Sequence, residues 1–385
     1  MRRLLLLASA MVFLDVAFFS AIAPLLPSYV DELGMSRAAA GILSAAYAAG
    51  TLVGAMPAGW VASRVGPRRT VIAGLLLLGC ASLVFGLVHQ VVLLDAARFV
   101  QGTAGALIWS GALTWLITAT PDERRGAVIG TALGTAVAGA LLGPALGALA
   151  GSIGTGVVFG SVLGVSILLA YAAARTPESG SPETQPLREI VAVLISRPVV
   201  DASIFVGIPS LMFGAIEVLV PLRIDSLGGS NGLIALGFIA GAALEAVLAP
   251  IAGKVSDRVG RRSPYVVGLT ICAISMATVA VAMALGTVLA ALILSSLGAG
   301  ICFAPAMTLI SDVADASRLH QGFAAGVSNM AWALGQVLGG IGGGVVASVA
   351  GYAAPSLAIA AILMATVFYA FRTLETEPAA PPVGG

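Results

Sequence analysis

Charged side chains are scarce in this 385-residue chain. Asp, Glu, Lys and Arg together make up 10% of it, whereas soluble domains average about 25%. Hydrophobic residues make up 59%, and the mean hydropathy is +1.04. No soluble fold could bury that much apolar surface, so we expect an integral membrane protein embedded in a lipid bilayer. The net charge of only +1 argues against nucleic acid as a partner.

Cysteine and histidine are also rare. Cys80, Cys272 and Cys302 lie in apolar runs at unrelated spacings, as expected of small buried side chains. His89 and His320 fall at expected helix ends. No group of His, Cys and carboxylates has catalytic spacing, and no Gly-x-x-x-x-Gly-Lys-Ser/Thr loop occurs. We therefore expect no enzymatic activity, no metal site, no cofactor and no ATP-driven step.

Long apolar runs make up most of the chain. A membrane-spanning helix needs about 20 apolar residues, and the first run has no early cleavage site that would make it a signal peptide. The sequence predicts an all-α integral membrane protein with twelve transmembrane helices in two pseudo-symmetric six-helix bundles. The expected helices cover residues 4–30, 38–62, 68–89, 91–119, 125–150, 155–175, 199–222, 231–255, 263–284, 287–313, 320–349 and 352–372.

One long polar segment, rich in Pro, Ser and Glu, divides the chain. We expect an N-terminal bundle over residues 1–175, a cytoplasmic linker over 176–197 and a C-terminal bundle over 198–373. Residues 374–385, rich in Pro and Ala, are expected to form a disordered tail.

Basic residues indicate the orientation. All but three of the 19 Lys and Arg residues fall in segments on one side of the expected helices. Arg37 and Arg223 lie on the other side, and Arg98 lies within a helix. Because positive residues are retained in the cytoplasm, we expect both termini there and the protein in the cell inner (plasma) membrane.

Two copies of a basic, glycine-punctuated turn stand at matching places in the two halves. A repeated polar turn between apolar runs indicates a duplicated membrane bundle, which is typical of a transporter. The first copy has Gly59, Arg64, Gly66 and Arg68, and the second has Gly253, Asp257, Arg258, Gly260 and Arg261.

Small residues recur in the fifth and eleventh expected helices. Glycines spaced by four residues allow close approach of helix backbones in lipid. Two interpretations remain open, namely static packing and a smooth surface on which helices rock. The fifth helix has Gly139, Gly143 and Gly147, and the eleventh has Gly335, Gly339 and Gly343.

These motifs resemble those of the major facilitator superfamily. The two basic turns are similar to its loop motif, and Arg98-Phe99-Val100-Gln101-Gly102 is similar to its Arg-x-x-Gln-Gly motif. Gly139, Gly143, Pro144 and Gly147 fit its Gly-x-x-x-Gly-Pro-x-x-Gly motif of antiporters. The resemblance covers nearly the whole chain and implies the twelve-helix drug:proton antiporter branch.

The first and seventh helices are similar to those of vesicular amine transporters. The similarity includes Asp15, in Phe13-Leu14-Asp15, and Glu217, which precedes Pro221. Where those transporters have a lysine and two further acids, this chain has Tyr47, Gly300 and Asn329.

Asp15 and Glu217 lie near the middle of two symmetry-related helices. A carboxylate at the bilayer centre costs about 2.5–3.5 kcal/mol on insertion scales, so it usually lines a cavity or has a function. Burial favours its neutral form, which can hold a proton, whereas the ionised form can hold a cation. These occupants exclude each other, and this exclusion is the basis of cation–proton exchange. The alternative is a structural ion pair or hydrogen bond.

Several other charged residues are candidates for coupling or gating. Glu245 could be a second protonation site, or could pair with a loop arginine. Arg98 could drive proton release, or could hold the fourth helix by pairing with Asp95, with Asp15 or with a carbonyl group. Asp257, with Arg258 and Arg261, is expected to lock the inner face when the outer side is open, and Asp312 is expected to form a gate or loop ion pair.

Aromatic residues near the acids suit a lipophilic cation, because ammonium groups rest on ring faces within about 6 Å. Phe18 and Phe19 follow Asp15 by three and four residues, and Phe213 precedes Glu217 by one turn. Packing or lipid contact is the alternative for each of them. Further substrate-binding candidates are Tyr47, Trp109, Phe238, Asn329 and Trp332.

Together these features predict a proton-coupled antiporter that exports hydrophobic, cationic or amine-containing small molecules by alternating access. Its partners would be the small-molecule substrate, protons and the bilayer, and we expect a monomer. The alternatives are a carrier for another metabolite class, such as amino acids or sugars, and a non-enzymatic membrane sensor.

Overall fold

The computed structural model describes residues 2–177, 196–316 and 321–374. Within them, twelve helical spans are long and apolar enough to cross a membrane. The all-α fold with twelve transmembrane helices is therefore confirmed. Nearly all of the expected linker (176–197) and tail (374–385) lies outside the described residues, as does His320.

Most expected helices differ from the observed ones by a few residues at their ends. The elements are α1 (Arg2–Ser20), the 3₁₀ turn η1 (Ala23–Leu25), α2 (Leu26–Leu33), α3 (Arg37–Val65), α4 (Pro67–Leu87), α5 (Val91–Ala119), α6 (Asp122–Ile153), α7 (Thr155–Ala174), α9 (Arg197–Ser226), α10 (Asn231–Val259), α11 (Arg262–Val281), α12 (Leu285–Ala316), α13 (Gln321–Ala350) and α14 (Ala353–Thr373).

The first span is broken, so the prediction of one continuous helix over residues 4–30 is wrong. The α-helix ends at Ser20, and η1 and α2 complete the span. Pro24 and Pro27 stand at the starts of these two pieces. Because proline has no N–H to donate and its ring clashes with the preceding turn, it interrupts a helix. The break frees backbone carbonyl groups in the middle of the span.

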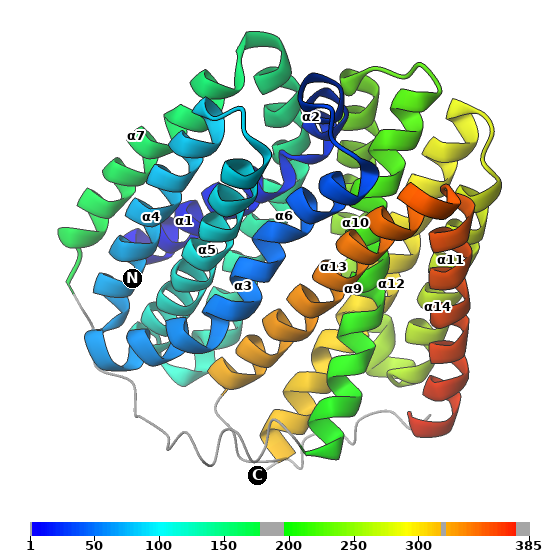
Figure 1. Cartoon of the computed structure of the whole chain (residues 1–385). Helices are drawn as coiled ribbons and strands as arrows, with labels where there is room; N and C mark the ends of the chain where they lie inside the picture. Colours follow the sequence, from blue (N-terminus) through cyan, green and yellow to red (C-terminus); the bar gives the residue numbers. More distant parts are fainter. Residues whose placement is uncertain (1, 178–195, 317–320, 375–385) are drawn as a thin grey trace.

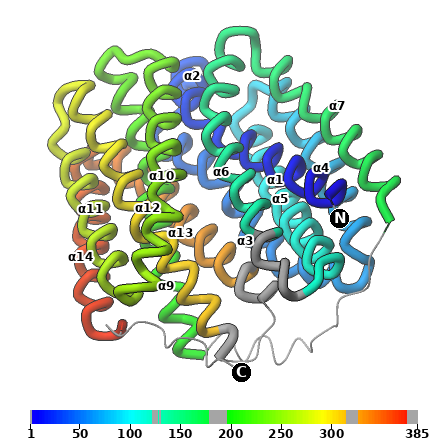
Figure 2. The backbone as a smooth tube through the Cα atoms, turned by 180° about the vertical axis from the view of Figure 1, so that it is seen from behind, coloured from blue at the N-terminus to red at the C-terminus, as the bar shows by residue number. Residues whose placement is uncertain are grey.

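The helices form two halves that stand side by side, α1–α7 in one and α9–α14 in the other (Figures 1 and 2). Each half has its own hydrophobic cluster of buried side chains. Matching pairs of helices make extensive contacts inside the halves, namely α1 with α6 in the first and α9 with α13 in the second. Between the halves, α3 lies along α13 and α6 meets α10.

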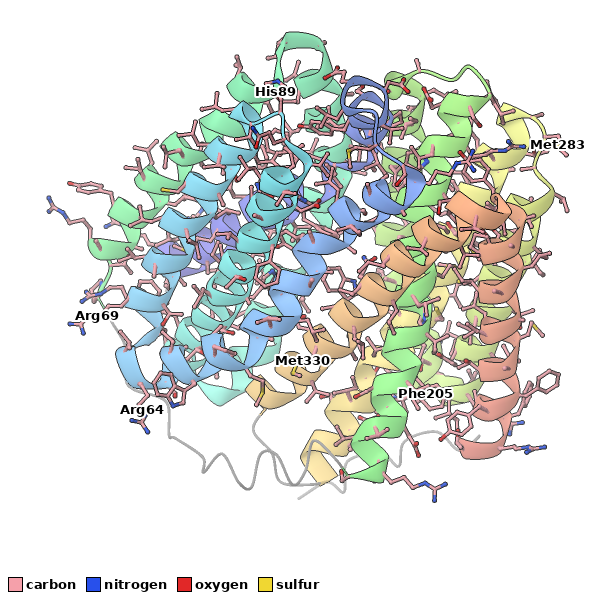
Figure 3. The ribbon with its side chains drawn as sticks, viewed as in Figure 1. Arg64, Arg69, His89, Phe205, Met283 and Met330 are labelled. Atoms are coloured by element: carbon pink, nitrogen blue, oxygen red, sulfur yellow. The ribbon has the colours of Figure 1, made fainter. Side chains whose placement is uncertain are left out.

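The two ends of the bundle differ in charge. Arg64 and Arg69 project from one end, which we call the basic end, while His89 and Met283 lie at the other, which we call the opposite end (Figure 3). The basic end carries both copies of the glycine-punctuated turn. Gly66 and Gly260 in these turns have φ of 96° and 84°, which only glycine adopts without strain.

The halves are in close contact at the opposite end. A methyl group at Gly41 of α3 would overlap the Gly340 carbonyl oxygen and lie 3.1 Å from the Gly344 Cα atom, both of α13. The Asn231 amide donates a hydrogen bond of 2.8 Å to the Ser28 hydroxyl of the other half.

A stacked aromatic ring reinforces this closed end. The Arg37 guanidinium of the N-terminal half lies over the Tyr352 ring, 4.4 Å from its centroid, and donates to the Ala347 carbonyl at 3.0 Å. The Arg223 guanidinium also lies over the Tyr352 ring, at 5.3 Å. At the basic end, by contrast, Gly130 and Gly326 have no atom within 4 Å of an added Cβ.

Candidate functional site

Asp15 is a buried carboxylate near the middle of the bundle. It is 1% exposed, and its side chain accepts two hydrogen bonds from other helices. The Tyr47 hydroxyl of α3 donates to Oδ1 at 2.7 Å, and the Trp109 indole N–H of α5 donates to Oδ2 at 3.2 Å. Two donors stabilise the ionised form of a carboxyl group. Both carboxyl oxygens thus accept a hydrogen bond from a neutral group, and Asp15 forms no ion pair among the described residues.

Arg98 caps the broken end of α1. Its guanidinium is fully buried and donates to the carbonyl oxygens of Phe18 and Phe19 at 3.2 and 3.1 Å. These carbonyls belong to the last turn of α1, where helix carbonyls lack partners and the helix dipole favours a cation. Of the interpretations that the sequence left open, the carbonyl pairing is observed. Arg98 makes no ion pair with Asp95 or Asp15 within 4.0 Å in the described structure.

The residues that follow Arg98 join two more helices, α3 and α4, to this cap. The Gln101 amide oxygen accepts from the Arg98 guanidinium at 3.1 Å, and its N–H group donates to the Ser82 hydroxyl of α4 at 3.0 Å. Gly102 lies directly against the Tyr47 carbonyl group of α3. This stretch of α5 therefore fixes both the α1 break and the backbone of the Asp15 partner Tyr47.

Glu217 of α9 faces the same site from the other half. The charge of Arg98 interacts with those of both Glu217 and Asp15, and the Ser44 hydroxyl of α3 lies against the Glu217 carboxyl group. One buried cation is thus shared electrostatically by two acids from different halves, in a region of low dielectric where such interactions are strong. Arg98 is thus within electrostatic range of both acids that the sequence singled out.

Three aromatic rings pack against one another between the halves, beside Asp15. The Phe19 ring lies 4.8 Å from the Tyr47 ring and 5.5 Å from the Trp332 ring of α13. Phe19, Trp109 and Trp332 are half-buried, so part of each ring faces open space. Apolar ring faces next to a carboxylate suit an organic cation.

Phe18 and Phe213 do not pack with Phe19, so the expected cluster of these three rings is wrong. Phe18 points into the core of the N-terminal half, where its ring meets Phe159 of α7 at 5.4 Å. Phe18 and Phe19 are consecutive residues of α1, and consecutive residues of an α-helix point about 100° apart. Phe213 packs against Phe303 of α12 at 5.6 Å, within the C-terminal half.

Glu245 and Asn329 lie on helices of the C-terminal half. Glu245 is half-buried on α10 where α12 crosses it, and a Cβ at Gly300 would lie 3.2 Å from its Cα atom. It forms no ion pair with a loop arginine in the described part of the chain. Asn329 is half-buried on α13, one turn before Trp332.

Gly105 is a site residue that sequence reasoning missed. A Cβ atom there would overlap the Tyr47 hydroxyl oxygen and lie 2.8 and 3.0 Å from the two Asp15 carboxyl oxygens. The missing side chain makes the space in which the Asp15–Tyr47 pair sits. The sequence held a weak signal, because Gly102 and Gly105 lie one turn apart, but only the helix packing gives it meaning.

We expect Gly105→Ala to weaken binding of a cationic substrate about ten-fold, equivalent to ~1.4 kcal/mol. The added methyl group would displace the Tyr47 hydroxyl from Asp15. The measurement is the substrate dissociation constant of purified protein in nanodiscs. Gly164→Ala, where an added Cβ has no neighbour within 4 Å, is the matched control. Equal affinities in both variants would contradict the assignment.

Comparison of the sequence with known protein families agrees with this twelve-helix fold. The family model described as Major Facilitator Superfamily matches residues 6–244 and 202–385, which together cover nearly the whole chain. The chain belongs to the major facilitator superfamily. It is therefore a non-enzymatic membrane carrier, and its described residues include twelve helices long and apolar enough to cross the bilayer.

Similar curated members of the superfamily cover part of the chain. It is 28% identical to the MFS-type transporter ppzB of Metarhizium majus over 125 residues. The matched segment is 31% of this chain and 27% of that protein. It is 28% identical over 109 residues to multidrug resistance protein 2 of Bacillus subtilis, 28% of this chain and 27% of that protein. The quinolone resistance protein NorA of Staphylococcus aureus is 23% identical over 119 residues, 31% of each chain. The matches span about a third or less of these relatives.

Solved structures agree on the fold over the whole length. A bacterial homologue of the human lysosomal transporter Spinster, described as inward-facing and occupied, gives a TM-score of 0.80 at 16% identity and covers 98% of both chains. Its inward-facing, unoccupied form gives 0.77 at 14% identity, also with 98% of both covered.

The antiporter-type motif of the superfamily packs α6 onto α1. An added Cβ at Gly139 would lie 2.8 Å from the Phe13 carbonyl oxygen. Gly143 abuts Ser20 and the Ala17 carbonyl, and Gly147 abuts the Ala21 carbonyl at the α1 break. Pro144 is buried between them within α6. The glycines of α13 repeat this arrangement against α9, where Gly335 and Gly339 meet the Gly207 and Leu211 carbonyl groups.

The two superfamily loop motifs make contacts inside their own halves. Arg261 pairs with Asp257 at 2.7 Å and with Asp312 of α12 at 3.2 Å. In the first copy, the Arg64 guanidinium lies 5.2 Å over the Trp60 ring, and Arg68 donates to the Thr176 carbonyl at 3.5 Å.

The remaining motif positions are turn residues and exposed side chains. Arg258 is exposed, and Gly59 and Gly253 have no atom closer than 4.0 Å to an added Cβ. Among the residues described at the basic end, none of these motif contacts joins the two halves, whereas the opposite end is closed.

Proposed function

We propose that the chain is a proton-coupled antiporter that exports hydrophobic, cationic or amine-containing small molecules. The observation that carries the proposal is the environment of Asp15. This buried carboxylate accepts hydrogen bonds from two neutral donors, and the half-buried rings of Phe19, Trp109 and Trp332 lie nearby. An acid without a close ion pair in a membrane bundle is costly, and such acids mark substrate pathways, ion pathways and proton relays. A proton and an organic cation are the two candidates, and one carboxylate cannot hold both.

Tyr47 allows Asp15 to accept either partner. A phenol hydroxyl can donate or accept, whereas the Trp109 indole can only donate. When Asp15 is ionised, both groups donate to it, as observed. When Asp15 is protonated, its new O–H can donate to the Tyr47 oxygen. Arg98, always charged, favours the ionised form and therefore proton release.

The cycle follows from the orientation that the basic residues imply. With the basic end in the cytoplasm, contact at the opposite end corresponds to an inward-facing state. We propose that substrate enters from the cytoplasm and displaces the proton, that the carrier then opens outward, and that an external proton releases the substrate. The carrier would act as a monomer in the cell inner membrane, with both termini cytoplasmic. The relatives named for multidrug and quinolone resistance support an efflux role.

Uptake into proteoliposomes under an imposed pH gradient tests the proposal. Wild-type protein should move lipophilic amines and fluorescent dye cations against protons, and internal pH should change with substrate flux. Uncharged analogues, sugars and amino acids form the comparison panel. Transport of an amine without proton movement would refute antiport, and transport of sugars or amino acids alone would refute the substrate class.

Tyr352→Ala is expected to shift the carrier toward an open opposite end. The change removes the ring that Arg37 and Arg223 cover, and such contacts contribute about 0.5–1 kcal/mol each at exposed sites. Spin labels at Ser36 and Val349, both exposed at that end, should show a larger population of long distances by double electron–electron resonance.

A matched control removes an equivalent contact elsewhere. Tyr171→Ala breaks the stack of Arg175 on Tyr171 within α7 and should leave the distance distribution unchanged. If Tyr352→Ala also leaves it unchanged, the stacked ring does not hold the halves together.

A further inference from the structure

A second carboxylate lies in a groove on the outside of the bundle. The groove has a volume of about 300 Å³ and is formed by α3, α5 and α13. Asp95 is its one charged lining residue, and the others are Ala, Ile and Phe, among them Ile42, Phe99 and Ile341. The volume is at the lower end of the range for small-molecule sites, about 300–1,000 Å³.

The groove is separate from the Asp15 site. Ser44 and Tyr47 of α3 face that site, whereas Ile42 and Ala49 line the groove. Positions two residues apart point about 200° apart on a helix, so the two sites lie on opposite sides of α3. Ile42 is 42% exposed, and uncovered side chains of a membrane helix face lipid.

One carboxyl oxygen of Asp95 lacks a partner among the described residues. Its Oδ1 atom is buried and has no hydrogen-bond partner. Arg98, one turn further along α5, is directed to the carbonyl groups of α1 instead. A carboxylate left in an apolar groove, without hydrogen bonds or a counter-charge, is unfavourable. The groove therefore offers a strong attraction to a cation that also has an apolar part.

We propose that this groove binds an amphiphilic organic ammonium compound from the adjoining lipid leaflet, with Asp95 as the counter-ion. The apolar part of the compound would lie along Ile42 and Phe99. Asp95 is about one turn below the start of α5, so a head group there is close to the membrane surface. No basic residue lines the groove, so it has no partner for the phosphate of a phospholipid, and this favours a simple amine over a lipid head group.

An occupant would also affect the transport cycle. Ile341 belongs to α13 of the C-terminal half, and the other lining residues belong to the N-terminal half. A compound seated in the groove thus bridges both halves and favours the conformation seen here. Turnover at the central site should fall as the groove fills, because a ligand shifts a conformational equilibrium toward the state that binds it better.

The test uses the full chain in nanodiscs of phosphatidylglycerol, which has no cationic head group. A decylammonium probe carrying a diazirine is photolysed, and labelled peptides are identified by mass spectrometry. Labelling should fall on the peptides that contain Ile42 and Phe99, and Asp95→Asn should lower it about ten-fold. The uncharged decanol analogue should label wild type and Asp95→Asn equally. Asp31→Asn, an exposed acid at the same end, should leave labelling by the ammonium probe unchanged.

A second variant keeps the carboxylate and fills the space. Ala49→Leu should lower labelling by both probes, which separates occupancy of the groove from an effect of charge alone. Each variant is first required to move substrate by the central site. Equal labelling by the ammonium and alcohol probes in wild type would overturn the proposal. Loss of labelling on adding phosphatidylethanolamine, only where Asp95 is present, would assign the groove to a lipid head group and also overturn it.

Discussion

Asp15→Asn is expected to lower proton-driven amine transport by about 100-fold or more, equivalent to ~2.7 kcal/mol. The amide has nearly the shape of the carboxylate but can neither ionise nor take up a proton in the pH range of transport. The Tyr47 hydroxyl and the Trp109 N–H would then face a group with one acceptor oxygen in place of two. The measurement is the initial rate of uptake into proteoliposomes under an imposed pH gradient.

Three comparisons make this prediction specific. Asp31→Asn removes an exposed acid of the same span and should transport normally. Tyr47→Phe keeps the carboxylate but removes one donor, and should show an intermediate rate with an altered pH profile. Glu217→Gln tests the acid of the other half. Wild-type exchange by both Asp15→Asn and Glu217→Gln would exclude the site described here.

Gly143→Val is the second change with a large expected effect, this time on folding. The new side chain would overlap Ser20 and the Ala17 carbonyl of α1, which are backbone or short side-chain atoms with little freedom to move. Overpacking of this kind costs about 1–3 kcal/mol. It would also move the α1 break away from Arg98, because the same turn carries the carbonyl groups that Arg98 binds. We expect a lower melting temperature and less folded protein.

Gly134→Val is the matched control on the same helix. An added Cβ at Gly134 has no neighbour within 4 Å, so the variant should keep its melting temperature. Thermal unfolding followed by tryptophan fluorescence in detergent compares the two. Equal melting temperatures would show that α6 can move away from α1 at little cost. The motif glycines would then act in rocking of the helices, not in static packing.

The depth of Asp15 in its helix was predictable, but the side-chain directions of its neighbours were not. An acid deep in an apolar run stands out in any sequence, because the bilayer makes it costly. The expected cluster of Phe18, Phe19 and Phe213 assumed that Phe18 and Phe19 share the helical face of Asp15. Phe18 and Phe19 point about 100° apart on α1, so packing of this helix places Phe18 in the core and Phe19 beside the site.

The polar partners of Arg98 were likewise not predictable from the sequence. The sequence allowed an ion pair with Asp95, three residues away, and it allowed carbonyl groups as partners. The structure gives the carbonyl pairing, because the α1 break presents two unpaired acceptors across the bundle. Asp95 consequently lines a groove with one oxygen unpaired among the described residues. No local pattern could indicate this groove, since its walls come from α3, α5 and α13.

The sequence by itself determined the membrane environment, the twelve helices and the duplication, because these depend on composition and on periodic local patterns. Only the tertiary structure decided which carbonyl groups Arg98 caps, why Gly105 must lack a side chain, and which end of the bundle is closed. These properties depend on contacts between helices that are far apart in the chain, and side-chain direction at each contact is set by helix breaks and crossing geometry.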